Sequence, residues 1–115
     1  MINRVDFRES FRYYDREVVI EIIDLFLETY KPLVNELRKS ISEGDIDKVI
    51  MHAHSLKGLA GTFLEPVARN VAASLEEKAR NNEFAEIPAL FSGLELSIEE
   101  MAGDLQKIRD QFKDG

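Results

Sequence analysis

Apolar residues recur at helical spacing along this 115-residue chain, and no segment alternates apolar and polar residues long enough to predict a strand. Four long amphipathic helices are predicted over residues 15–44, 45–63, 66–80 and 86–113. A short helix is predicted before them, over residues 3–13. Short connections between helices that each carry one apolar stripe favour antiparallel packing. The sequence therefore predicts an all-α fold, an antiparallel up-down-up-down four-helix bundle with a short extra N-terminal helix, in a single domain over residues 1–115.

Capping residues and prolines mark the predicted helix ends. Asp15 and Asp45 are predicted N-caps of the first two long helices, and Gly44 closes the turn between these helices. Pro66 suits the first turn of the third long helix. Pro32 lies inside the first long helix, where the apolar stripe continues in phase, so we expect a kink there rather than a helix end.

Two apolar stripes lead to specific expectations about the core. The third long helix is predicted to bury Val67, Val71, Ala72, Leu75 and Ala79. The last helix has apolar residues alternately four and three positions apart, at Ile87, Phe91, Leu94, Ile98, Met101, Leu105, Ile108 and Phe112. This spacing is typical of a coiled-coil dimer, but helices within one bundle use it as well, and the bundle is the favoured interpretation.

The charge of the chain narrows the range of partners. Fifteen Lys and Arg residues against 22 Asp and Glu residues give a formal net charge of −7, which repels nucleic acid and anionic lipid. The sequence contains no cysteine, and it has neither a membrane-length apolar run nor the apolar core of a signal peptide. We therefore expect a cytoplasmic, monomeric domain without nucleic-acid or membrane contact, either free-standing or part of a longer chain.

The clearest chemical signal lies in residues 51–63, on the second long helix. At about 100° per residue, His54 lies about 120° from the direction of the core, on the shoulder of the helix. Lys57, Gly58 and Gly61 fall within about 60° of His54 on the same strip. Glycine inside a helix costs up to about 1 kcal/mol relative to alanine, so two glycines beside one histidine indicate that another protein approaches closely there.

Histidine at this place suits phosphoryl transfer. Its unperturbed pKa is roughly 6.5, so a neutral, nucleophilic ring nitrogen is available at physiological pH. Phosphoryl transfer needs in-line geometry and charge neutralisation, and Lys57 supplies a positive charge one turn away. His52 points about 160° away from His54, and two histidines two positions apart are poorly spaced to share a metal, so no metal site is predicted. No nucleotide-binding segment or hydrolytic triad is found, and the domain is not expected to be an enzyme.

The residues around His54 carry a family resemblance. Residues 53–58, Ala-His-Ser-Leu-Lys-Gly, resemble the A-H-x-L-K-G signature of the histidine-containing phosphotransfer (HPt) domains of multistep phosphorelays. The resemblance spans residues 15–112 and also includes Phe26-Leu27-Glu28 with Pro32, Gly44-Asp45, and Leu75-Glu76. The short motif gains specificity from the all-helical frame around it.

The resemblance implies a role for each residue of the site. His54 would accept a phosphoryl group at Nε2 from a receiver-domain aspartate and pass it to another receiver. Lys57 would stabilise the phosphohistidine, and Gly58 would leave room for it. In many members a polar residue 22 positions after the histidine bonds the other ring nitrogen, and Glu76 stands at that position.

The resemblance also implies the partners. Response-regulator receiver domains, including those of hybrid sensor histidine kinases, would dock on this face and bring the Mg²⁺, so the chain is expected to need no cofactor of its own. Ile50, an apolar residue close to His54, is expected to be exposed and to take part in docking. The alternative is a helical docking or dimerisation domain that carries no phosphate, which the heptad spacing of the last helix supports.

The chain departs from the family pattern at one place. Family members usually have glycine ten residues after the histidine, whereas this chain has Leu64, followed by Glu65 and Pro66. The helical wheel places Leu64 toward the core. We therefore expect the connection at residues 64–66 to differ from that of other members.

Overall fold

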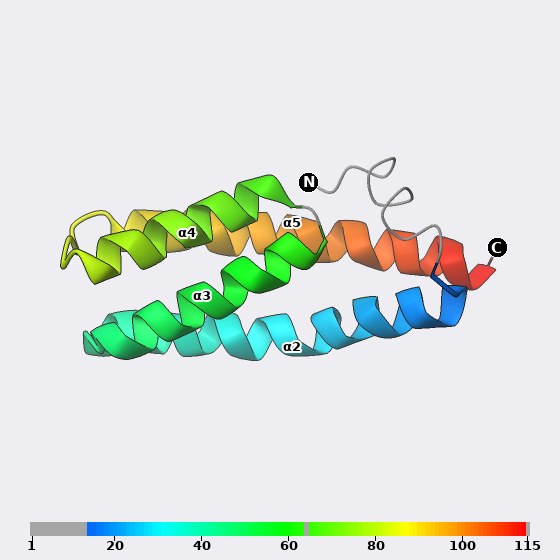
Figure 1. Ribbon diagram of the computed structural model, residues 1–115, viewed down its shortest axis with the longest axis horizontal. Coiled ribbons are helices and arrows are strands. Elements are labelled where there is room, and N and C mark those ends of the chain that lie inside the picture. Colours follow the sequence, from blue (N-terminus) through cyan, green and yellow to red (C-terminus); the bar gives the residue numbers. More distant parts are fainter. Residues whose placement is uncertain (1–13, 64, 115) are drawn as a thin grey trace.

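The fold is seen in a computed structural model, which describes residues 14–63 and 65–114. These residues form four α-helices, α2 (Arg16–Glu43), α3 (Ile46–Thr62), α4 (Pro66–Arg80) and α5 (Ile87–Asp114), and no strand within the described ranges. α2 and α4 each pack against both α3 and α5, and successive helices run in opposite directions (Figure 1). The predicted up-down-up-down bundle is confirmed. The predicted helix over residues 3–13 and the core position of Leu64 lie outside the described residues.

The helix ends follow the capping residues with one difference. Gly44 ends α2 in the left-handed conformation, with a φ of 68°. The Asp45 carboxylate then accepts a hydrogen bond from the Lys48 amide and caps α3. Asp15 occupies the N-cap position of α2, but its side chain makes no capping hydrogen bond. The tight α2–α3 turn is therefore fixed by local chemistry, whereas the start of α2 has no side-chain cap from Asp15.

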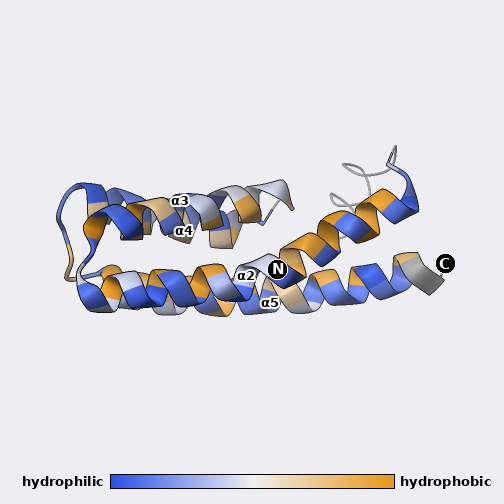
Figure 2. Ribbon diagram, turned by 90° about the horizontal axis from the view of Figure 1, so that it is seen from below, coloured by the Kyte–Doolittle hydropathy of each residue, from blue (hydrophilic) through white to orange (hydrophobic). Residues whose placement is uncertain are grey.

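Pro32 lies inside α2 without ending it, as predicted. Figure 2 shows α2 bending part way along its length. Proline cannot donate the backbone hydrogen bond that a regular helix requires, which accounts for a bend in this region. The shorter helices α3 and α4 lie over one end of the pair formed by α2 and α5, and both long helices continue past them (Figures 1 and 2).

The core consists of the predicted stripes, except at the start of α4. The buried positions of α4 are Ala68, Ala72, Leu75, Glu76 and Ala79. Val67 and Val71 were predicted to be buried, but Val67 is 53% exposed and Val71 is half-buried against the core. Burial in α4 begins with Ala68, four residues before Ala72, and Val67 is one position out of phase with it. At this end of α4, an alanine rather than a valine therefore packs against the neighbouring helices.

The heptad stripe of α5 is used inside the bundle. Seven of its eight residues are buried, namely Ile87, Phe91, Leu94, Ile98, Met101, Leu105 and Ile108, and Phe112 packs against them from the edge. This stripe is therefore unavailable as the seam of a coiled-coil dimer. The observation removes the main support for the docking or dimerisation alternative.

Candidate functional site

The candidate site lies where α3 and α4 run side by side in opposite directions. Glu76 on α4 contacts His54 on α3. Gly61 follows His54 by seven residues on α3, and Arg69 precedes Glu76 by seven residues on α4. Gly61 and Arg69 also lie next to each other. Both contacts belong to one antiparallel register. The side of α4 that carries Arg69 and Glu76 therefore runs alongside the His54 strip of α3, which extends from His54 to Gly61.

A single carboxylate joins the charged groups of the site. Glu76 Oε2 lies 3.0 Å from His54 Nδ1 and also accepts a hydrogen bond of 3.0 Å from the Arg80 guanidinium. Glu76 Oε1 accepts a hydrogen bond of 2.8 Å from Lys57 Nζ. The structure thus contains the Glu76–His54 contact that the family resemblance implied, and it adds Lys57 and Arg80 to the same carboxylate.

The Glu76 carboxylate is buried but remains ionised at neutral pH. Its side chain is only 8% exposed, and this burial by itself raises the pKa of the carboxyl group. Hydrogen bonds from Lys57, Arg80 and His54 outweigh the burial and hold the pKa of Glu76 at about 2. A buried carboxylate is tolerated when several donors satisfy it in this way.

This ionisation determines the tautomer of His54. An ionised carboxylate can only accept hydrogen bonds, so the proton of the contact must reside on His54 Nδ1. In the neutral imidazole the lone pair is then on Nε2. The His54 side chain is 66% exposed, which leaves this face of the ring accessible from solution.

The two glycines of the His54 strip differ in their surroundings. A Cβ atom added to Gly58 would meet nothing within 4 Å, so no packing within the described fold demands glycine there. A Cβ atom added to Gly61 would lie 3.6 Å from the Arg69 side chain, an ordinary van der Waals distance. Gly58 keeps open space beside His54, whereas Gly61 lies under a side chain from α4.

Sequence reasoning missed one residue of the site and misplaced another. Arg80 was not singled out, although its position four residues after Glu76 is a sequence signal for an ion pair on one helix face. Ile50 was expected to be exposed for docking, but it is half-buried and packs against the core. Its neighbour Met51 is exposed instead, because position 50 is closer than position 51 to the core side of α3. His52 is half-buried and takes no part in the Glu76 cluster.

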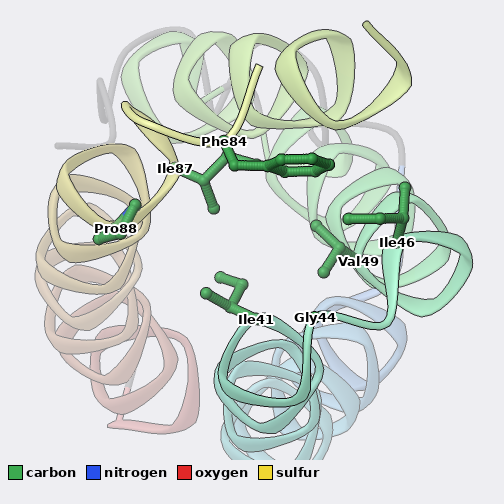
Figure 3. Close-up of a pocket in the computed structure, with 7 residues that line it drawn as sticks. All are labelled: Ile41, Gly44, Ile46, Val49, Phe84, Ile87 and Pro88. Carbon is green, nitrogen blue, oxygen red and sulfur yellow. The ribbon is translucent and has the colours of Figure 1, made fainter. Parts of the chain in front are cut away.

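An apolar pocket lies apart from the His54 site and offers no group for chemistry. This pocket of about 300 Å³ lies at the end of the bundle where two helix connections meet (Figure 3). It is lined by Ile41, Gly44, Ile46, Val49, Phe84, Ile87 and Pro88. None of these side chains is titratable or nucleophilic. Among the described residues, no three His, Cys, Asp or Glu side chains gather closely enough to hold a metal ion, and no helix is long and apolar enough to span a membrane.

Fold and site together define a helical bundle that presents one exposed histidine, oriented by a buried carboxylate on the neighbouring helix. The chain belongs to the Hpt domain family, whose model matches residues 21–111. This match covers α3 and α4 completely and includes every residue of the Glu76 cluster.

Two individual proteins are similar to the chain. The phosphorelay intermediate protein rdeA of Dictyostelium discoideum is 23% identical over 99 residues, which are 86% of this chain and 37% of rdeA, so the chain spans little more than a third of that relative. The crystal structure of histidine-containing phosphotransfer protein B (HptB) from Pseudomonas aeruginosa PAO1 superimposes with a TM-score of 0.86. That alignment covers 96% of this chain and 95% of HptB at 20% sequence identity, and it establishes a shared fold.

The low pKa of Glu76 predicts how acid destabilises the protein. Because the folded-state pKa of about 2 lies below the ordinary value of 4.5, ionised Glu76 stabilises the fold above about pH 4.5. This contribution is lost as the pH falls from 4.5 toward 2. We expect the difference in unfolding free energy between wild type and Glu76→Gln to shrink by about 2 kcal/mol between pH 6 and pH 3, measured by urea denaturation. A difference that stays constant over this range would contradict the assigned pKa.

Proposed function

We propose that this domain is a phosphorelay carrier that accepts a phosphoryl group on His54 Nε2 from a receiver-domain aspartate and passes it to another receiver. The observation that carries the proposal is the contact between His54 Nδ1 and the buried, ionised Glu76 carboxylate. This contact leaves the lone pair on the exposed ring nitrogen. Membership of the Hpt domain family and the similarity to a phosphorelay intermediate support the same role.

The proposed transfer is a displacement at phosphorus. The Nε2 lone pair of His54 attacks the phosphorus of the aspartyl phosphate, a P–N bond forms, and the P–O bond to the aspartate breaks. The aspartate leaves as a carboxylate, and the Nδ1 proton stays in its hydrogen bond to Glu76. The phosphorylated ring acquires positive charge, which the Glu76 carboxylate stabilises at 3.0 Å. Transfer to the next receiver reverses these steps.

The remaining charges of the site assist this reaction. Lys57 and Arg80 both bind Glu76, so with a neutral His54 the four side chains carry one net positive charge. That charge favours an incoming phosphoryl group. In this proposal the receiver supplies the Mg²⁺ that neutralises the phosphoryl oxygens during transfer, and the chain supplies the oriented nucleophile. The buried α5 seam supports the further proposal that the domain works as a monomer.

Labelling of His54 tests the proposal directly. Incubation with a phosphorylated receiver domain and Mg²⁺ is expected to give a protein label that is lost in acid and survives alkali. The His54→Gln variant is expected to accept no label, while His52→Gln, altered two positions away on the same helix, should be labelled like wild type. Label that persists in His54→Gln would place the acceptor elsewhere and refute the assignment.

The Glu76 carboxylate is expected to accelerate transfer. A hydrogen bond to a charged group contributes about 1.5–3 kcal/mol, so Glu76→Gln should slow single-turnover phosphorylation of His54 by roughly 10- to 100-fold. Glu77→Gln is the matched control, because Glu77 is exposed on the adjacent position of α4. If Glu76→Gln and Glu77→Gln react at the same rate, Glu76 has no part in the reaction.

Gly58 is expected to lower the stability of the fold while it keeps space open for a receiver beside His54. Gly58→Ala should stabilise the fold by about 0.5–1 kcal/mol, since a helical glycine is replaced where the added Cβ meets nothing. The same variant should slow transfer, because the methyl group intrudes where the receiver approaches His54. Gly103→Ala on α5, where an added Cβ also has open space, should give the same stabilisation with unchanged transfer. Thermal unfolding and the labelling assay measure the two effects, and unimpaired transfer by Gly58→Ala would remove the access role.

A further inference from the structure

Arg69 is an exposed cation on the α4 strip that borders the His54 strip. Arg69, Ala73, Glu76 and Arg80 are spaced alternately four and three residues apart, so they lie on one side of α4. Glu76 and Arg80 already form the charge cluster next to His54. Arg69 therefore belongs to the same composite surface of α3 and α4, at its opposite end.

The ion pairs of α3 and α4 leave Arg69 available. The described residues of these two helices include five cations, and four of them make ion pairs within the described structure. Arg69 is the fifth and makes no such pair. Glu65 shares a shallow hollow of about 210 Å³ with Arg69, but the Glu65 side chain is buried and its Oε1 accepts the Val67 amide.

Arg69 lies close to α3 at Gly61. The Arg69 Cδ atom is 3.6 Å from where a Cβ atom on Gly61 would stand, an ordinary van der Waals distance. The aliphatic stem of Arg69 therefore extends from α4 toward α3. Packing of the stem restricts its rotamers before any partner arrives, which lowers the entropy lost on binding.

The distribution of charge indicates the chemistry of the partner group. α3 and α4 contain five Lys and Arg residues against three Asp and Glu residues, whereas α2 and α5 contain seven against twelve. The α3–α4 pair, which forms the site, is thus less acidic than the α2–α5 pair in a chain with a net charge of −7. Such an asymmetry orients an approaching protein with its acidic surface toward α3 and α4.

We propose that Arg69 is a docking residue that binds a carboxylate on the receiver surface, at the rim of the contact centred on His54. This inference rests on the proposed function. Seven residues along α4 separate Arg69 from Glu76, which is about 10 Å along the helix axis. Arg69 therefore acts on the association of the two proteins and not on the phosphoryl group.

Steady-state transfer kinetics test the inference, with the phosphorylated receiver domain that labels His54 as the probe. Arg69→Gln is expected to raise KM for the receiver about two- to fivefold at low ionic strength, the size of a rim ion pair, with kcat unchanged. The increase should disappear at about 0.5 M salt, where such a pair is screened. Arg69→Lys keeps the charge and should stay within about twofold of wild type.

Lys107→Gln provides the matched control. Lys107 is an exposed cation on α5, which packs against α2 and α4, so this variant makes the same charge change away from the proposed contact. Equal KM values for Arg69→Gln and Lys107→Gln, or a loss confined to kcat, would overturn the inference and leave the carrier function standing. Absence of label on His54 in the wild-type protein would overturn both. Circular dichroism of each variant verifies that the fold is intact.

Discussion

The buried carboxylate of Glu76 is the constraint on which the site depends. Removing a carboxylate from water is costly, and an unpaired one would take up a proton instead. Glu76 keeps its charge because Lys57 and His54 on α3 and Arg80 on α4 all donate to it. Two of these donors come from the neighbouring helix. The charge is therefore stable only while α3 and α4 keep their register, and the same register orients His54.

Small side chains bring the two helices close enough for these contacts. Between them, α3 and α4 bury five alanines, namely Ala53, Ala60, Ala68, Ala72 and Ala79. Helix axes approach more closely where the contact residues are small, so the Glu76 side chain can reach across to His54. The larger core residues come mainly from α2 and α5. On α2, Phe26 stacks on Tyr30 and meets Phe63, at the end of α3, edge-on. The large core residues of α2 and α5 thus support the α3–α4 pair, whose buried residues are mostly small and on which the site lies.

The sequence predicted those features that depend on local spacing. Helix ends followed from Gly44, Asp45 and Pro66, and the strip around His54 followed from the helical period. Glu76 came from the family resemblance, since nothing in the local pattern of α4 joins it to a residue on α3. Val67 was assigned to the core because a one-residue change of phase in α4 is invisible until the helix is packed.

The roles of the arginines required the register between the helices. Arg80 stands four residues after Glu76, but an i, i+4 pair on a helix is usually only a solvated surface pair. It becomes part of the site because Glu76 is buried and also bonded to His54. Gly61 was expected to keep space open, and the position of Arg69 beside it could not be inferred without knowing which residues of α4 oppose α3.

The pairing of the cations also matters for a carrier, which must release the group it accepts. Lys57 and Arg80 are already bound to Glu76, so a phosphoryl group on His54 attracts cations that a buried carboxylate partly neutralises. Free cations at these positions would bind the phosphoryl group more strongly and make its onward transfer less favourable. In the proposed function, Glu76 thus acts in two ways: it orients the ring for acceptance, and it limits the positive charge that would retain the product. A carrier between two aspartates requires both, because neither direction of transfer can be strongly downhill.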